Sequence, residues 1–176
     1  MLKAYLDRFE RTWDYDVSYQ RALLKASPVS FLKFAVATGM ADRRAAPRAF
    51  LAAVGLAAVL AEDCGPCVQI GVDMAVADGV DPDVIRALLA DDELAMGEDA
   101  RLGWRFARAS LARDLGACDP LRDEIVRRWG DKGLAAAGLA LVTARMYPTL
   151  KYAMGYGKAC SRVVVAGVAA PRAARS

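Results

Sequence analysis

The fold of this chain is decided by residues 49–79, which read AFLAAVGLAAVLAEDCGPCVQIGVDMAVADG. Residues 49–61 are apolar throughout, a pattern typical of a helix that is buried on most of its sides. Gly65 and Pro66 interrupt the pattern between two cysteines, and Gly79 stands where a helix commonly ends. The stretch therefore predicts a helix over residues 49–61 and a second helix that starts near Gly65, carries the C-x-x-C pair at its N-terminal turn and continues over residues 68–78.

The composition extends this prediction to the whole chain. Alanine supplies 36 of the 176 residues, threonine supplies 4, and asparagine is absent. Alanine is the best helix former, whereas strands favour β-branched and aromatic residues. With 56% hydrophobic residues and a net charge of only +3, the sequence lacks the signature of disorder. We therefore expect a single all-α domain, since a domain typically has about 100–200 residues.

Three helices are expected before the central stretch, the first of them amphipathic. The first has one apolar face, made by residues at helical spacing: Leu2, Leu6, Phe9 and Trp13. The second is expected to run from residue 16 or 18 to residue 26, and the third over residues 31–38, ended by Gly39. These helices make up an N-terminal segment, residues 1–47.

Further helices are expected after Gly79. Asp81, Pro82 and Asp83 match the N-cap, the first-turn proline and the first-turn acid of a helix over residues 84–89. The remaining helices are expected over residues 98–115, 121–129, 134–146 and 150–157, with turns at 116–120 and 147–149. Residues 173–176 are expected to form a frayed tail.

The two halves of the chain are weakly similar when Pro66 is aligned with Pro148. Each half then has an apolar helix, a break that contains the proline, and a shorter helix. The first half carries Cys64 and Cys67 at its break, where the second carries Met146 and Thr149. An internal duplication and a chance likeness between two Ala-rich helices explain this similarity equally well.

The composition excludes several classes of function. The chain has no histidine, which rules out a Ser-His-Asp triad, a Cys-His protease pair and any histidine–metal site. The nearly balanced charge gives no reason to expect a nucleic-acid partner. The apolar runs are shorter than the roughly 18–20 residues that span a bilayer, and residues 1–16 do not match a signal peptide. We therefore expect a cytoplasmic protein that contacts no membrane.

The C-x-x-C pair, Cys64 and Cys67, is the motif with the clearest chemistry. Two residues between cysteines at a helix N-terminus permit a disulfide, and the helix dipole there favours a thiolate. The carboxylates of Glu62 and Asp63 oppose this effect, since a negative charge disfavours a thiolate, but they can also transfer a proton. Cys64, Cys67, Glu62 and Asp63 are therefore the candidate catalytic residues.

Two other interpretations of the cysteines stay open. A zinc site would have to add Cys118 and Cys160, which lack the paired spacing of zinc ligands. The pair can also be two small buried hydrophobic residues. We favour redox chemistry, because disulfides in intracellular proteins are more often catalytic than structural, and we expect no metal and no cofactor.

The motif Cys-Gly-Pro-Cys is also that of thioredoxin, but the surrounding residues do not fit a thioredoxin fold. A thioredoxin site follows a β-strand, whereas residues 50–61 predict a helix. Asp63, and not a tryptophan, precedes Cys64. No run of alternating β-branched and aromatic residues follows to supply the remaining strands, so this fold is rejected.

A different family fits these residues. The segment from Leu60 to Cys67, with residues 68–83 after it, resembles the core of the carboxymuconolactone decarboxylase and alkylhydroperoxidase D (AhpD)-like family, in its C-x-x-C branch. The match includes the Ala-Asp-Gly-Val-Asp-Pro turn at residues 77–82 and extends loosely over residues 106–157. The resemblance implies an AhpD-like helical bundle with its core at residues 48–157, inside one domain of residues 1–172. It also implies a homo-oligomer.

This chain lacks the two residues that form the family's proton relay. The family's peroxidase motif has a histidine where this chain has Gly71, and a glutamate where it has Ala52. Besides Glu62 and Asp63, the nearest polar substitutes are Gln69 and Asp73. The family implies that Cys67 attacks and Cys64 resolves, whereas helix-end electrostatics favour Cys64 as the thiolate.

We expect a thiol–disulfide oxidoreductase or a weak hydroperoxide reductase that uses the Cys64/Cys67 pair. Its oxidant would be a hydroperoxide or a protein disulfide, and its electron donor a reducing protein or a small thiol. The alternative is a non-enzymatic helical binding or assembly protein that kept the fold and lost the relay. A decarboxylase acting on a lactone acid comes third, because the chain has no histidine.

Two further groups of residues admit more than one interpretation. Six arginines on neighbouring turns suggest either an anion site or a solvated face of mixed charge: Arg101, Arg105, Arg108, Arg122, Arg127 and Arg128. Tyr147, Tyr152 and Tyr156 either line a pocket that faces the cysteines or pack in the core.

Overall fold

The computed structural model describes residues 1–39, 42, 44–157 and 163–170. Helices account for most of the described residues, which confirms the all-α fold class. They are α1 (Leu2–Trp13), α2 (Ser18–Ala26), α3 (Pro28–Gly39), α4 (Arg48–Ala61), α5 (Gly65–Ala77), α6 (Pro82–Ala90), α7 (Glu98–Ala112) and α8 (Leu115–Ala153). A short hairpin pairs β1 (Val164–Val165) with β2 (Val168–Ala169) in antiparallel register. Cys160 and the expected tail at residues 173–176 lie outside the described residues.

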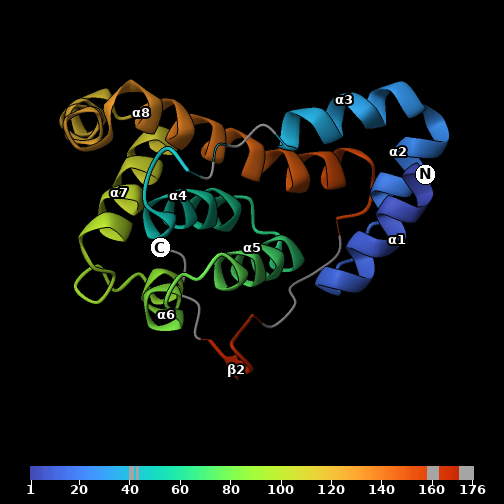
Figure 1. Ribbon diagram of the computed structural model, residues 1–176, viewed down its shortest axis with the longest axis horizontal. Helices are drawn as coiled ribbons and strands as arrows, with labels where there is room; N and C mark the ends of the chain where they lie inside the picture. Colours follow the sequence, from blue (N-terminus) through green and yellow to red (C-terminus); the bar gives the residue numbers. More distant parts are fainter. Residues whose placement is uncertain (40–41, 43, 158–162, 171–176) are drawn as a thin grey trace.

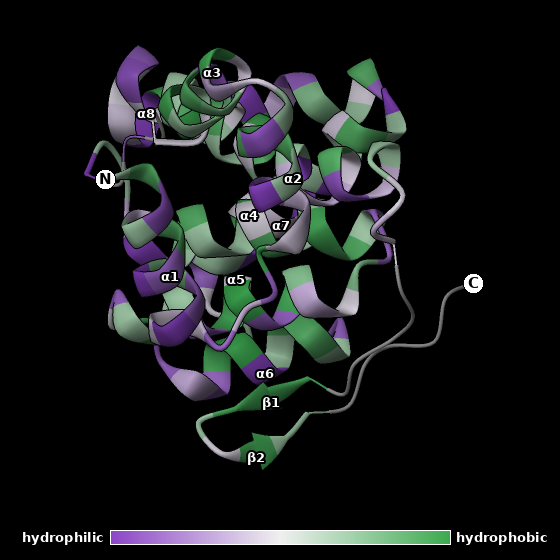
Figure 2. Ribbon diagram, turned by 90° about the vertical axis from the view of Figure 1, so that its right-hand side faces the viewer, coloured by the Kyte–Doolittle hydropathy of each residue, from purple (hydrophilic) through white to green (hydrophobic). Residues whose placement is uncertain are grey.

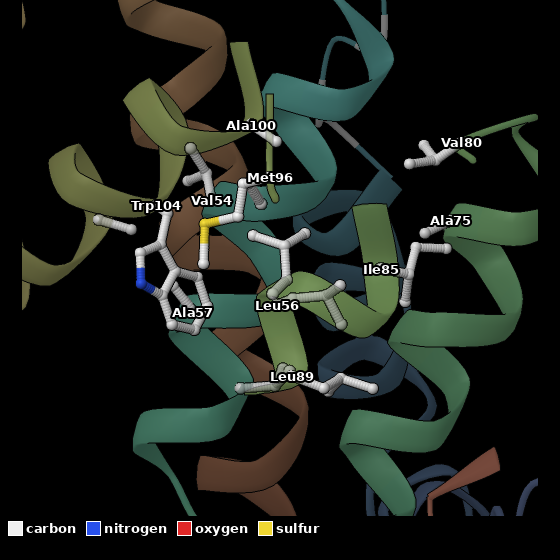
Figure 3. Close-up of a cluster of buried hydrophobic side chains, with 14 of the residues drawn as sticks. Val54, Leu56, Ala57, Ala75, Val80, Ile85, Leu89, Met96, Ala100 and Trp104 are labelled. Atoms are coloured by element: carbon white, nitrogen blue, oxygen red, sulfur yellow. The ribbon is translucent and has the colours of Figure 1, made fainter. Parts of the chain in front are cut away.

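Helix α4 lies at the centre of the main hydrophobic core. It packs against α5, α6, α7 and α8, and Figure 1 places it among these helices. In Figure 3, Val54 and Leu56 of α4 lie among Ile85, Met96 and Trp104 from the neighbouring elements. The all-apolar sequence of α4 is therefore explained by burial on several sides, as predicted.

Helices α4 and α7 approach each other closely at Gly103. A Cβ atom at this position would overlap the backbone carbonyl oxygen of Phe50, which leaves no room for a side chain. Glycine is therefore required here so that the two helix backbones can meet.

The N-terminal helices form a second hydrophobic cluster, at the right of Figure 1. The buried residues of this N-terminal cluster are Leu6, Tyr15, Val17, Tyr19 and Phe31. Ile70 of α5, together with Tyr147 and Leu150 of α8, packs against them. Helices α1–α3 are thereby held against α5 and the C-terminal part of α8.

The starts of α5 and α6 follow the predictions. Helix α5 begins at Gly65 with Cys64 as its N-cap residue, and no strand precedes it in the described chain. Gly79 follows α5 with φ at +82°, a conformation that favours glycine. Helix α6 begins at Pro82, and the Asp81 carboxylate accepts a hydrogen bond from the Asp83 N–H at 2.8 Å.

Two predicted turns are wrong, and both lie within α8. The turn expected at residues 116–120 is helical because the Asp114 side chain caps the helix, accepting from the Ala117 N–H at 3.0 Å. The break expected at 147–149 is replaced by helix that continues through Pro148. An interior proline costs about 3 kcal/mol, which burial of this segment against the N-terminal cluster offsets.

Helix α8 is instead interrupted at Gly130, where the sequence predicts a helix end. Gly130 has φ at +65° and ψ at −175°, which divides α8 into two parts that run in different directions (Figure 1). Because Pro148 lies inside a helix and Pro66 begins one, the similarity of the two halves does not extend to their breaks.

The sequence does not predict the short hairpin, which Figure 2 shows below α6. Gln69 of α5 holds it: the Gln69 amide donates to the Val164 carbonyl at 2.9 Å and accepts from the Val164 N–H at 2.7 Å. Val163 and Val165 are buried, as the apolar run predicts. Among the described helices, none has the length and apolar character needed to cross a bilayer.

Candidate functional site

Cys64 and Cys67 form a disulfide at the N-terminus of α5. Their Cα atoms are 5.2 Å apart, within the range of about 4.4–6.8 Å that is usual for a disulfide. The exposed fraction of Cys64 is 3% and that of Cys67 is 1%. A reactant therefore needs a pocket in order to reach either sulfur.

A pocket of about 210 Å³ reaches Cys67. Most of its walls come from α4, α5 and α8, and the N-terminal segment contributes Phe9, Tyr15, Thr38 and Asp42. The described lining residues include Cys67 but not Cys64. The two cysteines are therefore not equivalent: a molecule in the pocket meets Cys67.

The pocket exists because small residues face it from three helices. These residues are Ala52 and Gly55 on α4, Gly71 and Ala75 on α5, and Ala140 and Ala144 on α8. Larger apolar side chains, among them Leu51, Ile70 and Met74, complete the walls. A largely apolar wall with a few polar groups is typical of a small-molecule site.

Polar residues line the pocket away from Cys67. Thr38, Asp42, Arg48 and Asp78 all contribute to it, and the Arg48 guanidinium donates to the Asp78 carbonyl at 2.7 Å. Asp78 follows Cys67 by 11 positions at the end of α5, which corresponds to about 16 Å along the helix. The pocket therefore has a sulfur at one end of α5 and charged groups at the other.

Both positions that the family resemblance assigns to a proton relay line this pocket. Ala52 and Gly71 stand there together with Cys67. Neither side chain can transfer a proton. A Cβ atom added at Gly71 would lie 3.2 Å from Leu56 Cδ2, so a larger residue requires that leucine to move.

A chain of polar side chains from the N-terminal segment reaches Cys67 instead. The Tyr15 hydroxyl lies 3.6 Å from Cys67 Sγ and 3.3 Å from the Tyr19 hydroxyl, and Gln20 Nε2 donates to the Tyr19 hydroxyl at 3.0 Å. All three residues are buried. The sequence does not predict these contacts, because Tyr15 and Cys67 are 52 positions apart and no local pattern marks Tyr15 as a partner of Cys67.

Lys151 of α8 lies beside the two tyrosines. Its Nζ is 5.3 Å from the ring centroid of Tyr15 and 5.9 Å from that of Tyr19, and its exposed fraction is only 4%. Burial lowers the pKa of Lys151. Burial also raises the pKa of Tyr15 to about 12 and raises that of Tyr19, so both hydroxyls keep their protons at neutral pH.

The four acidic and amide candidates from the sequence lie apart from the pocket lining. Glu62 pairs with Arg145 at 2.5 Å, and the Asp63 carbonyl accepts from the Tyr152 hydroxyl at 3.0 Å. Gln69 donates to Asp73 at 2.8 Å and also holds the hairpin. Burial raises the pKa of Asp73. The described pocket lining therefore brings none of the four to Cys67.

The arginines and tyrosines singled out in the sequence mostly form ion pairs or pack against other side chains. Five of the six arginines form ion pairs with carboxylates, as on a solvated face: Arg105, Arg108, Arg122, Arg127 and Arg128. Tyr147 does line the pocket, and Tyr156 packs against the N-terminal cluster.

No metal site is found among the described residues, since none of their side chains cluster as a set of three or more potential ligands. Cys118 is a buried free thiol whose sulfur lies 3.3 Å from the Ser110 hydroxyl. Comparison of the chain with protein-family models, with curated proteins and with solved structures finds no match.

Proposed function

We propose that this protein is a thiol–disulfide oxidoreductase, or a weak hydroperoxide reductase, with Cys64 and Cys67 as its redox pair. One observation carries the proposal: of the two bonded sulfurs, Cys67 lines an apolar pocket and Cys64 does not. The resemblance of residues 60–83 to the AhpD-like family supports the same activity. In this proposal Cys67 is the attacking thiol and Cys64 is the resolving thiol.

The reaction balances as follows. The Cys67 thiolate attacks the terminal oxygen of a hydroperoxide, the O–O bond breaks, and the alkoxide leaves as an alcohol after it takes up a proton. Cys67 is then a sulfenic acid. The Cys64 thiol attacks this sulfur, which forms the disulfide and releases water. A reducing protein or a small thiol restores both thiols by two exchange steps.

The turnover with hydroperoxide is expected to be slow. A positioned acid or base typically contributes about 10²–10⁴-fold to a rate, and Ala52 and Gly71 supply neither. A protein disulfide remains the alternative oxidant, because exchange with it needs no O–O cleavage. A cytoplasmic location belongs to the same proposal, since the reducing compartment would supply the donor thiol.

The test uses the reduced wild-type protein and an organic hydroperoxide. We expect one hydroperoxide to be consumed for each Cys64–Cys67 disulfide that forms, as measured by peptide mass spectrometry. The Cys118→Ser variant is the matched control and should behave like the wild type, because Cys118 lies outside the pocket lining. If Cys64 and Cys67 stay reduced with the hydroperoxide and also with a disulfide as the oxidant, or if Cys118 or Cys160 is oxidised in their place, the proposal fails.

A second candidate function is a non-enzymatic binding or assembly protein. The deep burial of both sulfurs favours it, because a buried structural disulfide exchanges slowly. In that case a small apolar molecule would occupy the pocket and the disulfide would only brace the start of α5. A second experiment separates the two functions: the folded, oxidised protein is treated with a small thiol, and a structural disulfide would resist this reduction whereas a redox-active pair would be reduced.

A further inference from the structure

We propose that Tyr15 is a catalytic residue of this site. Its hydroxyl donates a hydrogen bond to the Cys67 sulfur and so stabilises the Cys67 thiolate. The inference rests on the proposed function, because it concerns the same Cys67. Tyr19 and Gln20 are assigned as positioning residues that orient the Tyr15 hydroxyl.

The direction of the hydrogen bonds follows from the disulfide. A disulfide sulfur carries no hydrogen, so in the contact of 3.6 Å the Tyr15 hydroxyl must be the donor to Cys67 Sγ. The Tyr15 oxygen is then free to accept from the Tyr19 hydroxyl, 3.3 Å away. The Tyr19 oxygen in turn accepts from Gln20 Nε2 at 3.0 Å. All donors therefore point toward the sulfur.

This arrangement becomes stronger when the disulfide is reduced. A hydrogen bond to a charged acceptor is shorter and stronger than one to a neutral acceptor, so the Tyr15 hydroxyl favours the thiolate over the thiol. Tyr15 keeps its own proton throughout, so the step changes no atom or electron count. Lys151 Nζ lies in the same buried region, 5.3 Å from the Tyr15 ring centroid.

The inference also explains what the N-terminal segment does. Tyr15 lies in the connection between α1 and α2, outside the residues that resemble the AhpD-like family. It lines the same pocket as Ala52 and Gly71, the two positions that lack a polar group for the relay. The N-terminal segment thus brings a hydrogen-bond donor to Cys67 from a part of the chain that the family motif does not include.

The experiment measures the pH at which Cys67 becomes reactive in the reduced protein. Iodoacetamide alkylates the thiolate, and peptide mass spectrometry assigns the rate at each pH to Cys67 separately from the other cysteines. We expect Tyr15→Phe to raise the midpoint of this profile by about 1–2 pH units, the size typical of a lost hydrogen bond to a charged group. The midpoint is read rather than the rate, because packing changes alter access at every pH alike.

The other titratable or charged groups near the sulfur and its tyrosines are the same in all variants. They are the Cys64 thiol beside Cys67, Asp16 in the α1–α2 connection, Tyr147 and Lys151 on α8, and Asp42, Arg48 and Asp78 along the pocket. Tyr152→Phe is the matched control, since its hydroxyl donates to the Asp63 carbonyl instead of to sulfur. Its midpoint should equal that of the wild type.

Tyr19→Phe provides a second, independent variant. It removes the donor to Tyr15 without touching the sulfur, so a smaller shift in the same direction is expected. An unchanged midpoint in Tyr15→Phe overturns the inference, and if that variant does not fold, an unchanged midpoint in Tyr19→Phe does so. The profile requires no hydroperoxide, so the inference and the proposed function fail by different results.

Discussion

At the scale of single residues, burial controls the chemistry around Cys67. Tyr15, Tyr19 and Lys151 lie together with almost no contact to water. Burial disfavours charge, so it raises the pKa of both tyrosines and keeps them in the neutral form that donates a hydrogen bond. For the same reason, it lowers the pKa of Lys151. A donor that stays neutral over the working pH range suits a site where the thiolate is the group that must ionise.

The same burial predicts a loss of stability in base. The pKa of Tyr15 is about 12 in the folded protein, whereas the ordinary value for a tyrosine is 10. Above pH 10, the unfolded chain therefore loses a proton that the folded protein retains. The free energy of unfolding should therefore fall as the pH rises from 10 toward 12, by roughly 2 kcal/mol from Tyr15. Urea denaturation at pH 8, 10 and 11 measures this slope.

Tyr15→Phe isolates the contribution of this residue. The variant should lose less stability than the wild type over the same pH interval, because its unfolded state has one tyrosine fewer to ionise. Lys151 acts in the opposite sense below its ordinary value of 10.5, but it is present in both proteins and cancels in the comparison. Equal slopes for the two proteins would show that Tyr15 does not hold its proton in the native state.

At the scale of helices, apolar pattern and end signals predict most elements, and tertiary packing decides the exceptions. The apolar residues 49–61 predict α4, and Cys64-Gly65-Pro66 predicts the start of α5. Pro148 does not end α8, because packing against the N-terminal cluster outweighs the local preference of proline. Likewise, the motif predicts the cysteine pair, whereas Tyr15 comes from a distant contact that no local pattern records.

The close approach of α4 and α7 makes Gly103 a sensitive position. Gly103→Ala should lower the free energy of unfolding by about 1–3 kcal/mol, since the new methyl group meets the Phe50 carbonyl and the backbones must separate. Gly138→Ala in α8 is the matched control, because open space surrounds that position. It should raise stability by about 0.5–1 kcal/mol through helix propensity. Denaturation curves that move in the same direction for both variants would contradict this packing.

At the scale of the whole molecule, one helix face remains exposed and apolar. Val29, Leu32 and Val36 recur on one face of α3, with exposed fractions of 62%, 46% and 63%. Helix α3 packs against α8, whose Leu139 and Val142 are also exposed. Because exposed apolar patches commonly mark an interface, we expect the homo-oligomer predicted from the sequence to assemble through this face of α3.

Sedimentation velocity at micromolar concentration tests this assembly. We expect a species larger than the 18.9 kDa monomer for the wild type, and a shift toward the monomer for Val36→Lys, because a charge would be buried in the interface. Val168→Lys places the same charge on an exposed valine of the hairpin and should leave the assembly unchanged. A wild-type protein that sediments as a monomer would contradict the proposal.

In the proposed reaction, Cys67 meets the oxidant in the pocket and Cys64 resolves the product. The most direct measurement is the trapping of a sulfenic acid with dimedone, located by peptide mass spectrometry, after hydroperoxide is added to single-cysteine variants of the pair. In Cys64→Ser, the account predicts a dimedone adduct on Cys67, since no resolving thiol is present to remove the sulfenic acid. In Cys67→Ser, it predicts no adduct on Cys64, which does not line the pocket. An adduct on Cys64 alone, or none on either residue, would contradict it.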